Sequence, residues 1–394
     1  MIHSLRFSNF YSFADETQID FSLGKKPTPS GYDIELADGR LNKVLAVVGA
    51  NGSGKTQFIK PLAFLSWFIC ESFLGSDPDA SIVYAPHSLL AQENTELELD
   101  FLLSGAEYRY QLVMNNHRVV SEALFVRTSS QYSYIFKREQ TEDGFVFRQK
   151  GFPFPKAQAE KVRANASLLA AAYSYDVAEA QPFIEYFRHI VTNVASSGRH
   201  YFQRGAVVHA AERYQNAPEL KAKMAEVMRE FDLGLDDVSI RKLEASNENG
   251  QTDVFYMPYG LHCSLEGEAF ELPFFEESSG TQSAFVLLEQ VLRVLHYGGV
   301  AVIDEIDNDL HPHLVPIMLD WFRFEHTNPH QAQMVFTCHT PEVLNRLQKH
   351  QVYLCEKQDL RSQAWRLDEM LGLRADDNLY AKYMAGALGA VPDV

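Results

Sequence analysis

The sequence predicts an α/β fold with a buried parallel sheet, an accessory antiparallel β-layer and an inserted helical segment. Uninterrupted apolar runs, typical of strands buried on both faces, lie at 44–48, 300–303 and 334–336. Alternating apolar and polar residues over 97–112 indicate antiparallel strands with one face in water. From about residue 156 to 237 the apolar spacing changes to the helical period. The parallel sheet is therefore expected to carry two additions, one of strands and one of helices.

The N-terminal segment is expected to form a β-hairpin. Residues 2–7 and 19–21 alternate as two strands would, and the turn-forming residues 12–16 lie between them. The buried run at 44–48 ends in glycine and leads into a loop and a helix. Beyond that helix, the alternating strands are expected to continue to about residue 150.

The helical segment and the last third of the chain follow in order. Helices are expected at 157–172, 182–194 and 218–231, the last two with proline at a first-turn position. Residues 251–275 return to strand-like patterning. Residues 281–295 then place apolar side chains on one helix face, ahead of the buried runs that complete the α/β core.

Composition narrows the class of protein. A chain of 394 residues with 46% hydrophobic content can fill a large core. Its formal charge of -17 opposes nonspecific adhesion to nucleic acid or anionic lipid, although a local basic groove is compatible with it. The four cysteines form no C-x-x-C pair, so neither a disulfide framework nor a zinc knuckle is indicated. With no long apolar stretch and no secretory signal, a cytoplasmic protein without a membrane partner is expected.

Residues 49–56, GANGSGKT, match the phosphate-binding loop pattern G-x-x-x-x-G-K-[ST] and lie between a predicted strand and a helix. Glycines let backbone N–H groups approach phosphates, and the helix N-terminus adds a favourable dipole. Lys55 is expected to reach the β and γ phosphates of ATP, and the Thr56 hydroxyl to bind Mg²⁺. The predicted nucleotide-binding residues of this loop are Gly49, Asn51, Gly52, Ser53, Gly54, Lys55, Thr56 and Gln57.

Two carboxylates end the apolar strand at 300–303. Asp304 in this position fits the residue that holds Mg²⁺ in P-loop enzymes, and Glu305 fits the base that activates water. Two solvated acids at a strand end are the simpler interpretation. Beside a complete phosphate-binding loop, however, the pair predicts ATP hydrolysis, with Glu305, His339 and Lys55 as the catalytic candidates.

Two further elements complete the set. Residues 277–282, ESSGTQ, form a Ser/Gly loop that leads into the predicted helix at 281–295, so Ser279 and Gly280 offer a second phosphate-binding helix N-terminus. A helix cap made by Ser279 explains the same letters and is compatible with phosphate binding. His339 follows the apolar run at 334–336, where an imidazole could contact the γ-phosphate, although a lone histidine is more often structural.

The order of these motifs resembles that of ABC-class ATPases of the RecF, SMC and OLD type. The resemblance implies that Ser279 and Gly280 act in trans, closing over ATP held by the P-loop of another subunit. It also places residues 307–311 at the D-loop and residues 9–13, NFYSF, near the nucleotide. The expected organisation is an N-terminal ATPase lobe at 1–150, a helical lid at 151–245 and a C-terminal ATPase lobe at 246–394.

Residues 277–282 and the ending at 383–392 more narrowly resemble bacterial anti-phage ATPases of the AbiL/RloA kind, with relatives in the PARIS (AriA) and Septu (PtuA) systems. This resemblance implies a homodimer or higher even-numbered oligomer that controls a separately encoded effector, often a nuclease. The alternative is a RecF-like DNA repair or maintenance ATPase that binds DNA directly. A transporter ATPase fits less well, because residues 277–282 lack the Leu-Ser-Gly-Gly-Gln signature sequence of transporters and the helical segment is long.

Several other features carry alternatives. Gln92 is the single candidate for a Q-loop residue, and a surface glutamine explains it equally well. Residues 311–313, HPH, resemble a metal pair but lack a third ligand nearby in the sequence, so a helix start is favoured. Residues 199–204 mix basic and aromatic side chains as nucleic-acid binders do, and a lid surface or partner contact is favoured over that function.

Overall fold

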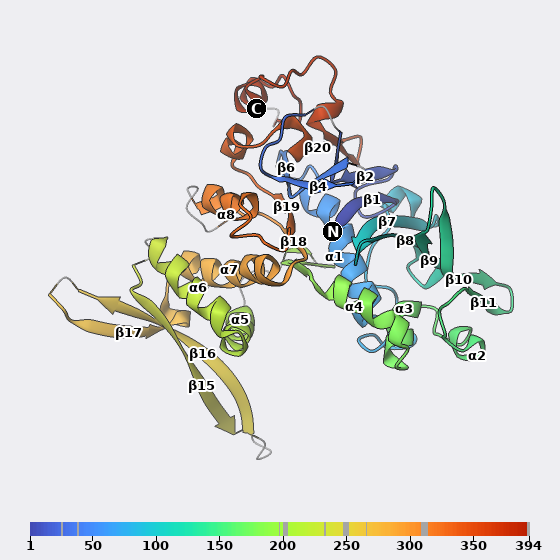
Figure 1. Cartoon of the computed structure of the whole chain (residues 1–394), viewed down its shortest axis with the longest axis horizontal. Coiled ribbons are helices and arrows are strands. Elements are labelled where there is room, and N and C mark those ends of the chain that lie inside the picture. The colour runs from blue at the N-terminus through green and yellow to red at the C-terminus, as the bar shows by residue number, and fades with distance from the viewer. Residues whose placement is uncertain are drawn as a thin grey trace.

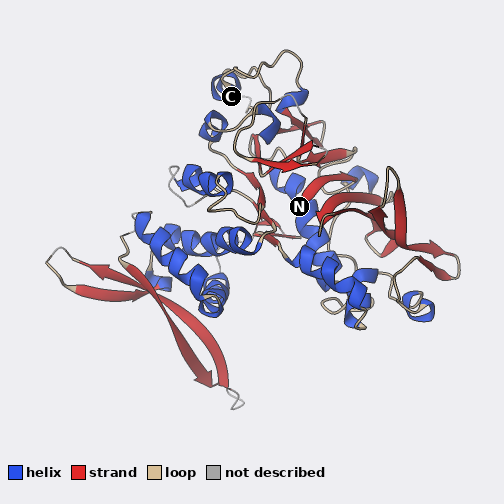
Figure 2. Cartoon of the chain, viewed as in Figure 1, coloured by secondary structure: helices blue, strands red, loops and turns tan. Residues whose placement is uncertain are grey.

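The computed structural model describes residues 1–24, 27–37, 39–196, 198–199, 204–231, 234–246, 252–264, 266–308 and 314–391. Its body consists of two β-sheets with helices packed between and around them, and a long β-arm extends from one side (Figure 1, Figure 2). No helix in these described ranges is long and apolar enough to cross a membrane.

A six-stranded sheet forms the centre and confirms the predicted buried runs. Its strands, in spatial order, are β12 (Ile190–Thr192), β18 (Val300–Ile303), β19 (Gln333–Thr337), β6 (Val44–Gly49), β20 (Val352–Gln358) and β21 (Arg361–Arg366). The first five are parallel, and β21 pairs antiparallel at the edge. Because parallel strands end at the same edge, the residues that follow β6, β18 and β19 meet there.

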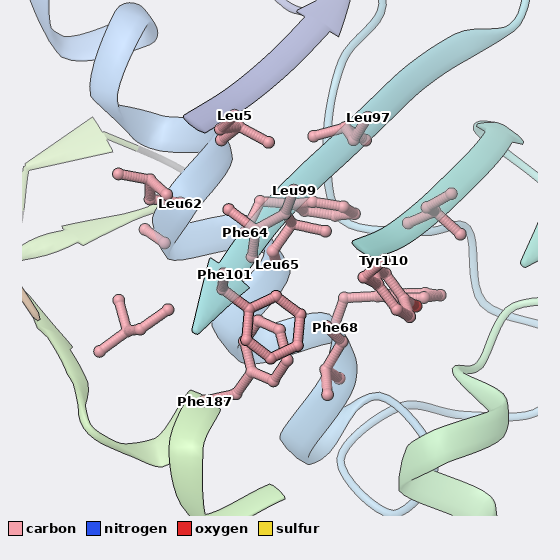
Figure 3. Close-up of a cluster of buried hydrophobic side chains, with 14 of the residues drawn as sticks. Leu5, Leu62, Phe64, Leu65, Phe68, Leu97, Leu99, Phe101, Tyr110 and Phe187 are labelled. Atoms are coloured by element: carbon pink, nitrogen blue, oxygen red, sulfur yellow. The ribbon is translucent and has the colours of Figure 1, made fainter. Parts of the chain in front are cut away.

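The accessory antiparallel β-layer is confirmed as a seven-stranded sheet. Its elements are β1 (Ile2–Ser8), β2 (Thr17–Asp20), β7 (Thr95–Leu103), β8 (Ala106–Asn115), β9 (Arg118–Arg127), β10 (Tyr132–Thr141) and β11 (Gly144–Gln149). Helix α1 (Lys55–Glu71) packs against this layer, and its Leu62, Leu65 and Phe68 lie beside Leu99 and Phe101 of β7 in one buried cluster (Figure 3). Burial of this cluster fixes the position of the helix that carries the phosphate-binding loop.

A second core covers the opposite face of the central sheet. It is built by α5 (Arg204–Asn216), α6 (Pro218–Glu230), α7 (Ser279–Tyr297) and α8 (Leu314–Arg323). Phe285, Leu288, Val291 and Leu295 are buried in it, as the predicted apolar face of the 281–295 helix requires. The expected strand pattern at 251–275 is present as an arm made of β15 (Asp237–Ser246), β16 (Thr252–Cys263) and β17 (Ala269–Pro273).

The helices of residues 151–245 are divided between the two cores. Helices α2 (Lys156–Ala159), α3 (Leu168–Ser174) and α4 (Gln181–Arg188) belong to the first core, whereas α5 and α6 belong to the second. The expected continuous helix at 157–172 is interrupted before Ser167, whose hydroxyl accepts hydrogen bonds from the first turn of α3. The expected helix at 182–194 ends at Arg188, because residues 190–192 pair with β18 as β12.

The remaining elements are short and connect the larger ones. They are β3 (Ser22–Leu23), β4 (Asp33–Leu36), β5 (Gly39–Asn42), β13 (Val194–Ala195), β14 (Gly198–Arg199), α9 (Leu379–Met384) and the 3₁₀ turns η1 (Ser88–Leu90), η2 (Ala178–Ala180), η3 (Phe274–Glu276), η4 (Pro341–Asn345), η5 (Lys349–Gln351) and η6 (Leu367–Glu369). The segment after α9 reaches the phosphate-binding loop, where the Ala390 carbonyl accepts a 3.1 Å hydrogen bond from Ala50 N–H.

Candidate active site

The phosphate-binding loop connects β6 to α1 and depends on glycine at two places. A Cβ on Gly49 would lie 2.2 Å from the Cys355 carbonyl oxygen of the neighbouring strand, so no side chain fits there. Gly54 precedes α1 with φ 108°, in the left-handed region, and a Cβ on it would lie 2.3 Å from the Ser362 hydroxyl. Gly49 is therefore required by the close approach of a neighbouring backbone, and Gly54 by its left-handed conformation and the nearby serine side chains.

Lys55 lies folded over its own loop. Its Nζ donates hydrogen bonds to the carbonyls of Gly49 at 2.9 Å and Ala50 at 3.1 Å, and the residue is 6% exposed. Burial lowers the pKa of this ammonium from its ordinary value. An anionic phosphate at the loop would offer the lysine a stronger partner than these neutral carbonyls.

Asp304 at the end of β18 is held by two hydroxyl groups. Thr56 Oγ1 donates to one carboxylate oxygen at 2.9 Å, and Thr337 Oγ1 donates to the other at 2.6 Å. Desolvation raises the pKa of Asp304, and the hydrogen bonds from the two threonines oppose that rise. A threonine hydroxyl and a carboxylate 2.9 Å apart are hard oxygen donors of the kind that Mg²⁺ accepts together with phosphate oxygens and water.

Glu305 is fixed at both its backbone and its side chain. Its φ of 49° lies in the left-handed region, and its N–H donates to Thr337 Oγ1 at 2.7 Å. Its carboxylate contacts His339 Nε2 at 3.3 Å through one oxygen and Arg199 Nη1 at 2.6 Å through the other. Desolvation raises the pKa of this carboxyl, but the contacts with His339 and Arg199 outweigh it and leave the pKa below its ordinary value.

These residues line one cavity of about 260 Å³ at the carboxyl edge of the central sheet. Its lining residues are Asn51, Gly52, Gly54, Lys55, Thr56, Gln57, Asp304, Glu305 and His339. Ser53, within the same loop, is buried, and its hydroxyl has no hydrogen-bond partner among the described residues. The structure therefore brings together, from three strand ends, nearly every site residue expected for phosphate, metal and water.

Ser279 and Gly280 are placed differently. They begin α7, where Ser279 is exposed, and neither lines the cavity at the phosphate-binding loop. The cap that the sequence assigned to Ser279 belongs to Ser278, whose hydroxyl accepts a 3.1 Å hydrogen bond from Thr281 N–H. The Ser279 side chain therefore lies on the surface, at the first residue of the helix.

The outcomes of the remaining expectations differ. Asp307 accepts hydrogen bonds from the backbone N–H groups of His339 and Thr340, so it ties the start of the D-loop segment to the histidine. Residues 309–313, which include the rest of that segment and the HPH triplet, lie outside the described ranges, as do residues 200–203 of the basic and aromatic stretch. Gln92 is exposed and does not line the cavity.

The NFYSF segment at residues 9–13 lies outside the cavity and contacts the elements next to the phosphate-binding loop. The Asn9 side-chain amide donates to the carbonyls of Leu90 and Glu93 at 3.0 Å, fixing the loop before β7. The Ser12 hydroxyl lies 2.8 Å from that of Ser362, beside the backbone of Gly54. The segment thus lies near the phosphate-binding loop, as the resemblance implied.

Three residues of the site are not among the catalytic, metal-binding or phosphate-binding residues predicted from the sequence. Thr337, inside β19, links Asp304 and Glu305, as described above. Asn193 follows β12 and pairs twice with the Asp304 backbone, accepting from its N–H at 2.8 Å and donating to its carbonyl at 2.9 Å. Arg199 contacts Glu305. Two sequence signals bear on them: the β-branched run at 190–192, which the helical spacing assigns to a helix, and the basic and aromatic stretch at 199–204, which includes Arg199.

Comparison with known families decides the class. Residues 44–345 match the family described as "AAA domain, putative AbiEii toxin, Type IV TA system", and this span is more than half of the 394-residue chain. The chain belongs to this family. As an AbiEii-type AAA protein with a complete phosphate-binding loop and an Asp-Glu strand end, it is an ATP-hydrolysing P-loop enzyme. No curated protein matches the chain significantly.

Three solved structures resemble this AbiEii-type ATPase over most of their length. An Smc head bound to the C-winged helix domain of ScpA has a TM-score of 0.46 at 12% identity, covering 94% of this chain and 99% of that one. The SMC head domain from Thermotoga maritima has a TM-score of 0.38 at 14% identity, covering 93% of this chain and 98% of that one. The third is an Smc head with an extended coiled coil, bound to the C-terminal domain of ScpA derived from Pyrococcus furiosus. Its TM-score is 0.45 at 11% identity, and the match covers 93% of this chain and 97% of that one. Likeness this distant carries no information about partners.

Proposed function

We propose that this ATPase hydrolyses Mg-ATP at the cavity between α1 and the ends of β18 and β19. The observation that carries the proposal is the direct contact of Thr56 with Asp304, with Lys55 and Glu305 lining the same cavity. The loop residues Gly49, Asn51, Gly52, Ser53, Gly54 and Gln57 would surround the phosphates together with Lys55. Thr56 and Asp304 would hold Mg²⁺, which supplies charge neutralisation for the β and γ phosphates.

Glu305 and His339 supply the groups for the hydrolytic step. Glu305 would accept a proton from the attacking water, because it lines the same cavity as Lys55. His339 lines the same cavity and would contact the γ-phosphate. The transferred phosphoryl group needs positioning and electrostatic stabilisation more than covalent chemistry, and this residue set offers both.

The complete site is proposed to form between two copies of the chain. Ser279 is exposed and Gly280 is half-buried at the start of α7, and neither lines the cavity of its own chain, which supports action in trans. The α7 N-terminus, with its exposed Ser279, would then stabilise the γ-phosphate held by the partner. An ATP-dependent homodimer follows, with higher even-numbered assemblies built from it.

Mixing two inactive variants tests the shared site. Lys55→Ala keeps an intact α7 N-terminus and Ser279→Arg keeps an intact phosphate-binding loop, so a mixed dimer contains one undamaged composite site. We expect each variant alone to be inactive and the mixture to recover up to about half of the wild-type ATPase rate if the two sites act independently. An inactive mixture in which heterodimers are demonstrated by mass would argue against sharing by independent sites.

We further propose that the ATP-bound dimer controls a separately encoded effector, of nuclease type, in bacterial anti-phage defence. Support comes from the motif resemblance and from a family description that includes a toxin of a type IV toxin–antitoxin system. The test is co-purification with the product of the adjacent gene. Association should be stronger with Glu305→Gln in ATP, which accumulates the closed dimer, than with Lys55→Ala. Equal association with both would remove nucleotide control from the proposal, and salt-sensitive binding of DNA to the closed dimer would favour the RecF-like alternative.

A further inference from the structure

A short hairpin directly follows β12 and carries Arg199. Its strands β13 and β14 pair Val194 with Arg199 and Ala195 with Gly198. The Arg199 side chain is 9% exposed, although the protein around this hairpin is open enough to leave Glu305 32% exposed. Its Nη1 lies 2.6 Å from Glu305 Oε2, a distance typical of a charge-assisted hydrogen bond.

The turn of this hairpin is fastened to the helix of the phosphate-binding loop. The Ser196 carbonyl accepts hydrogen bonds from the Tyr11 hydroxyl and from Lys60 Nζ, both at 2.9 Å. The Lys60 ammonium also lies 3.9 Å from the centre of the Tyr11 ring, so a cation–π contact joins the two donors. Because Lys60 belongs to α1, the turn of the Arg199 hairpin is fixed relative to Lys55 and Thr56.

Arg199 contacts Glu305 from outside the cavity of the phosphate-binding loop. It lines a separate cavity of about 410 Å³ bounded by β12, α5 and α7, and it does not line the cavity of the phosphate-binding loop. Glu305 lines both cavities. The arginine therefore contacts one carboxylate oxygen from outside the cavity of the phosphate-binding loop. His339, which lines that cavity, contacts the other oxygen at 3.3 Å.

We propose that Arg199 is a positioning residue for hydrolysis, which holds the Glu305 carboxylate in one orientation toward the phosphate-binding loop. The inference rests on the proposed role of Glu305 as the base. It assigns to the end of β12 a pair of functions, with Asn193 fixing the Asp304 backbone and Arg199 fixing the Glu305 side chain.

Two competing effects of the arginine differ in size. A neighbouring cation makes a carboxylate a weaker base, which by itself slows proton transfer. Displacing a catalytic group by about 1 Å can reduce a rate by roughly 10²-fold, so fixing the orientation of a long, partly exposed side chain has the larger effect.

The experiment compares Arg199→Met and Arg199→Lys with the control Arg188→Met. Arg188 ends α4 on the same side of the molecule, and its guanidinium lies over the Tyr173 ring and not at the site. We expect Arg199→Met to lower kcat by about 10- to 100-fold while KM and the dissociation constant for a fluorescent ATP analogue change by less than about threefold. Arg199→Lys should recover part of the loss, and Arg188→Met should match the wild type.

Combination with Glu305→Gln shows whether the arginine acts through the glutamate. If it does, adding Arg199→Met to Glu305→Gln should cause no further fall in kcat. A kcat that rises in Arg199→Met, loss of ATP binding, or an equal further fall in the double variant would each overturn the inference. Failure of the proposed function looks different, because Glu305→Gln alone would then hydrolyse ATP at the wild-type rate. Unchanged melting temperatures exclude misfolding of the variants.

Discussion

The ends of β6 and β12 both deliver residues to the site, but they do so by different means. The end of β6 is a contiguous loop whose function depends on backbone N–H groups and on glycines at 49 and 54, where no other residue fits. The segment after β12 uses the Asn193 side chain to hold the Asp304 backbone and the Arg199 side chain to contact the Glu305 carboxylate. The first arrangement can be recognised in sequence as a motif, whereas the second exists only after β12 has paired with β18.

The largest effect is expected at the β6 end, from Lys55→Ala. Removal of the ammonium deletes the charge that would meet the β and γ phosphates, so ATP hydrolysis should fall to background. Phosphate release with purified protein measures this. The nucleotide-free melting temperature should barely change, because the lysine's partners in the free loop are two neutral carbonyls. ATP turnover equal to wild type would refute the assignment of the phosphate-binding loop.

Glu305→Gln should lower kcat by roughly 10²-fold or more while ATP binding persists, because a positioned general base is lost and the shape of the side chain is kept. Size-exclusion chromatography in ATP should show accumulation of the closed dimer. Asp304→Asn serves as the comparison, since it removes the proposed Mg²⁺ partner of Thr56. Loss of ATP binding in Glu305→Gln, with full turnover retained in Asp304→Asn, would mean that the two carboxylates are assigned the wrong way round.

Asn193→Ala tests whether the β12 end matters for catalysis. It deprives the Asp304 N–H and carbonyl of their side-chain partners, and an unsatisfied buried group costs about 1–3 kcal/mol. We expect kcat to fall about tenfold and the melting temperature to fall by several degrees. Asn216→Ala, at the exposed end of α5, serves as the matched control. An unchanged kcat in Asn193→Ala would show that β18 positions Asp304 without help from β12.

The smallest effect is expected from Tyr11→Phe. The change removes one of the two hydrogen bonds to the Ser196 carbonyl and keeps the ring beneath Lys60. A net loss of about 0.5–1.5 kcal/mol per hydrogen bond corresponds to a looser hairpin, and we expect kcat to fall about two- to fivefold with KM unchanged. Lys60→Met should have a larger effect, because it removes both the second hydrogen bond and the cation. Wild-type kcat in both variants would show that the hairpin needs no anchoring.

The sequence by itself determined the parallel core strands, the antiparallel layer, the phosphate-binding loop and the Asp304–Glu305 strand end. Each of these is a local pattern, in which burial on both faces or a tight loop demands particular residue types in sequence order. The placement of His339 beside Glu305 also follows, since parallel strands end at the same edge.

The tertiary structure decided the rest. Residues 190–192 continue a helical pattern in sequence, yet they form a strand because their β-branched side chains are placed beside the buried β18. The contacts of Asn193, Arg199 and Thr337 join segments far apart in the chain, and no local preference encodes such convergence. The helix cap is Ser278 and not Ser279, one residue later in the sequence. Either hydroxyl can make the same capping hydrogen bond, so the sequence alone does not distinguish them.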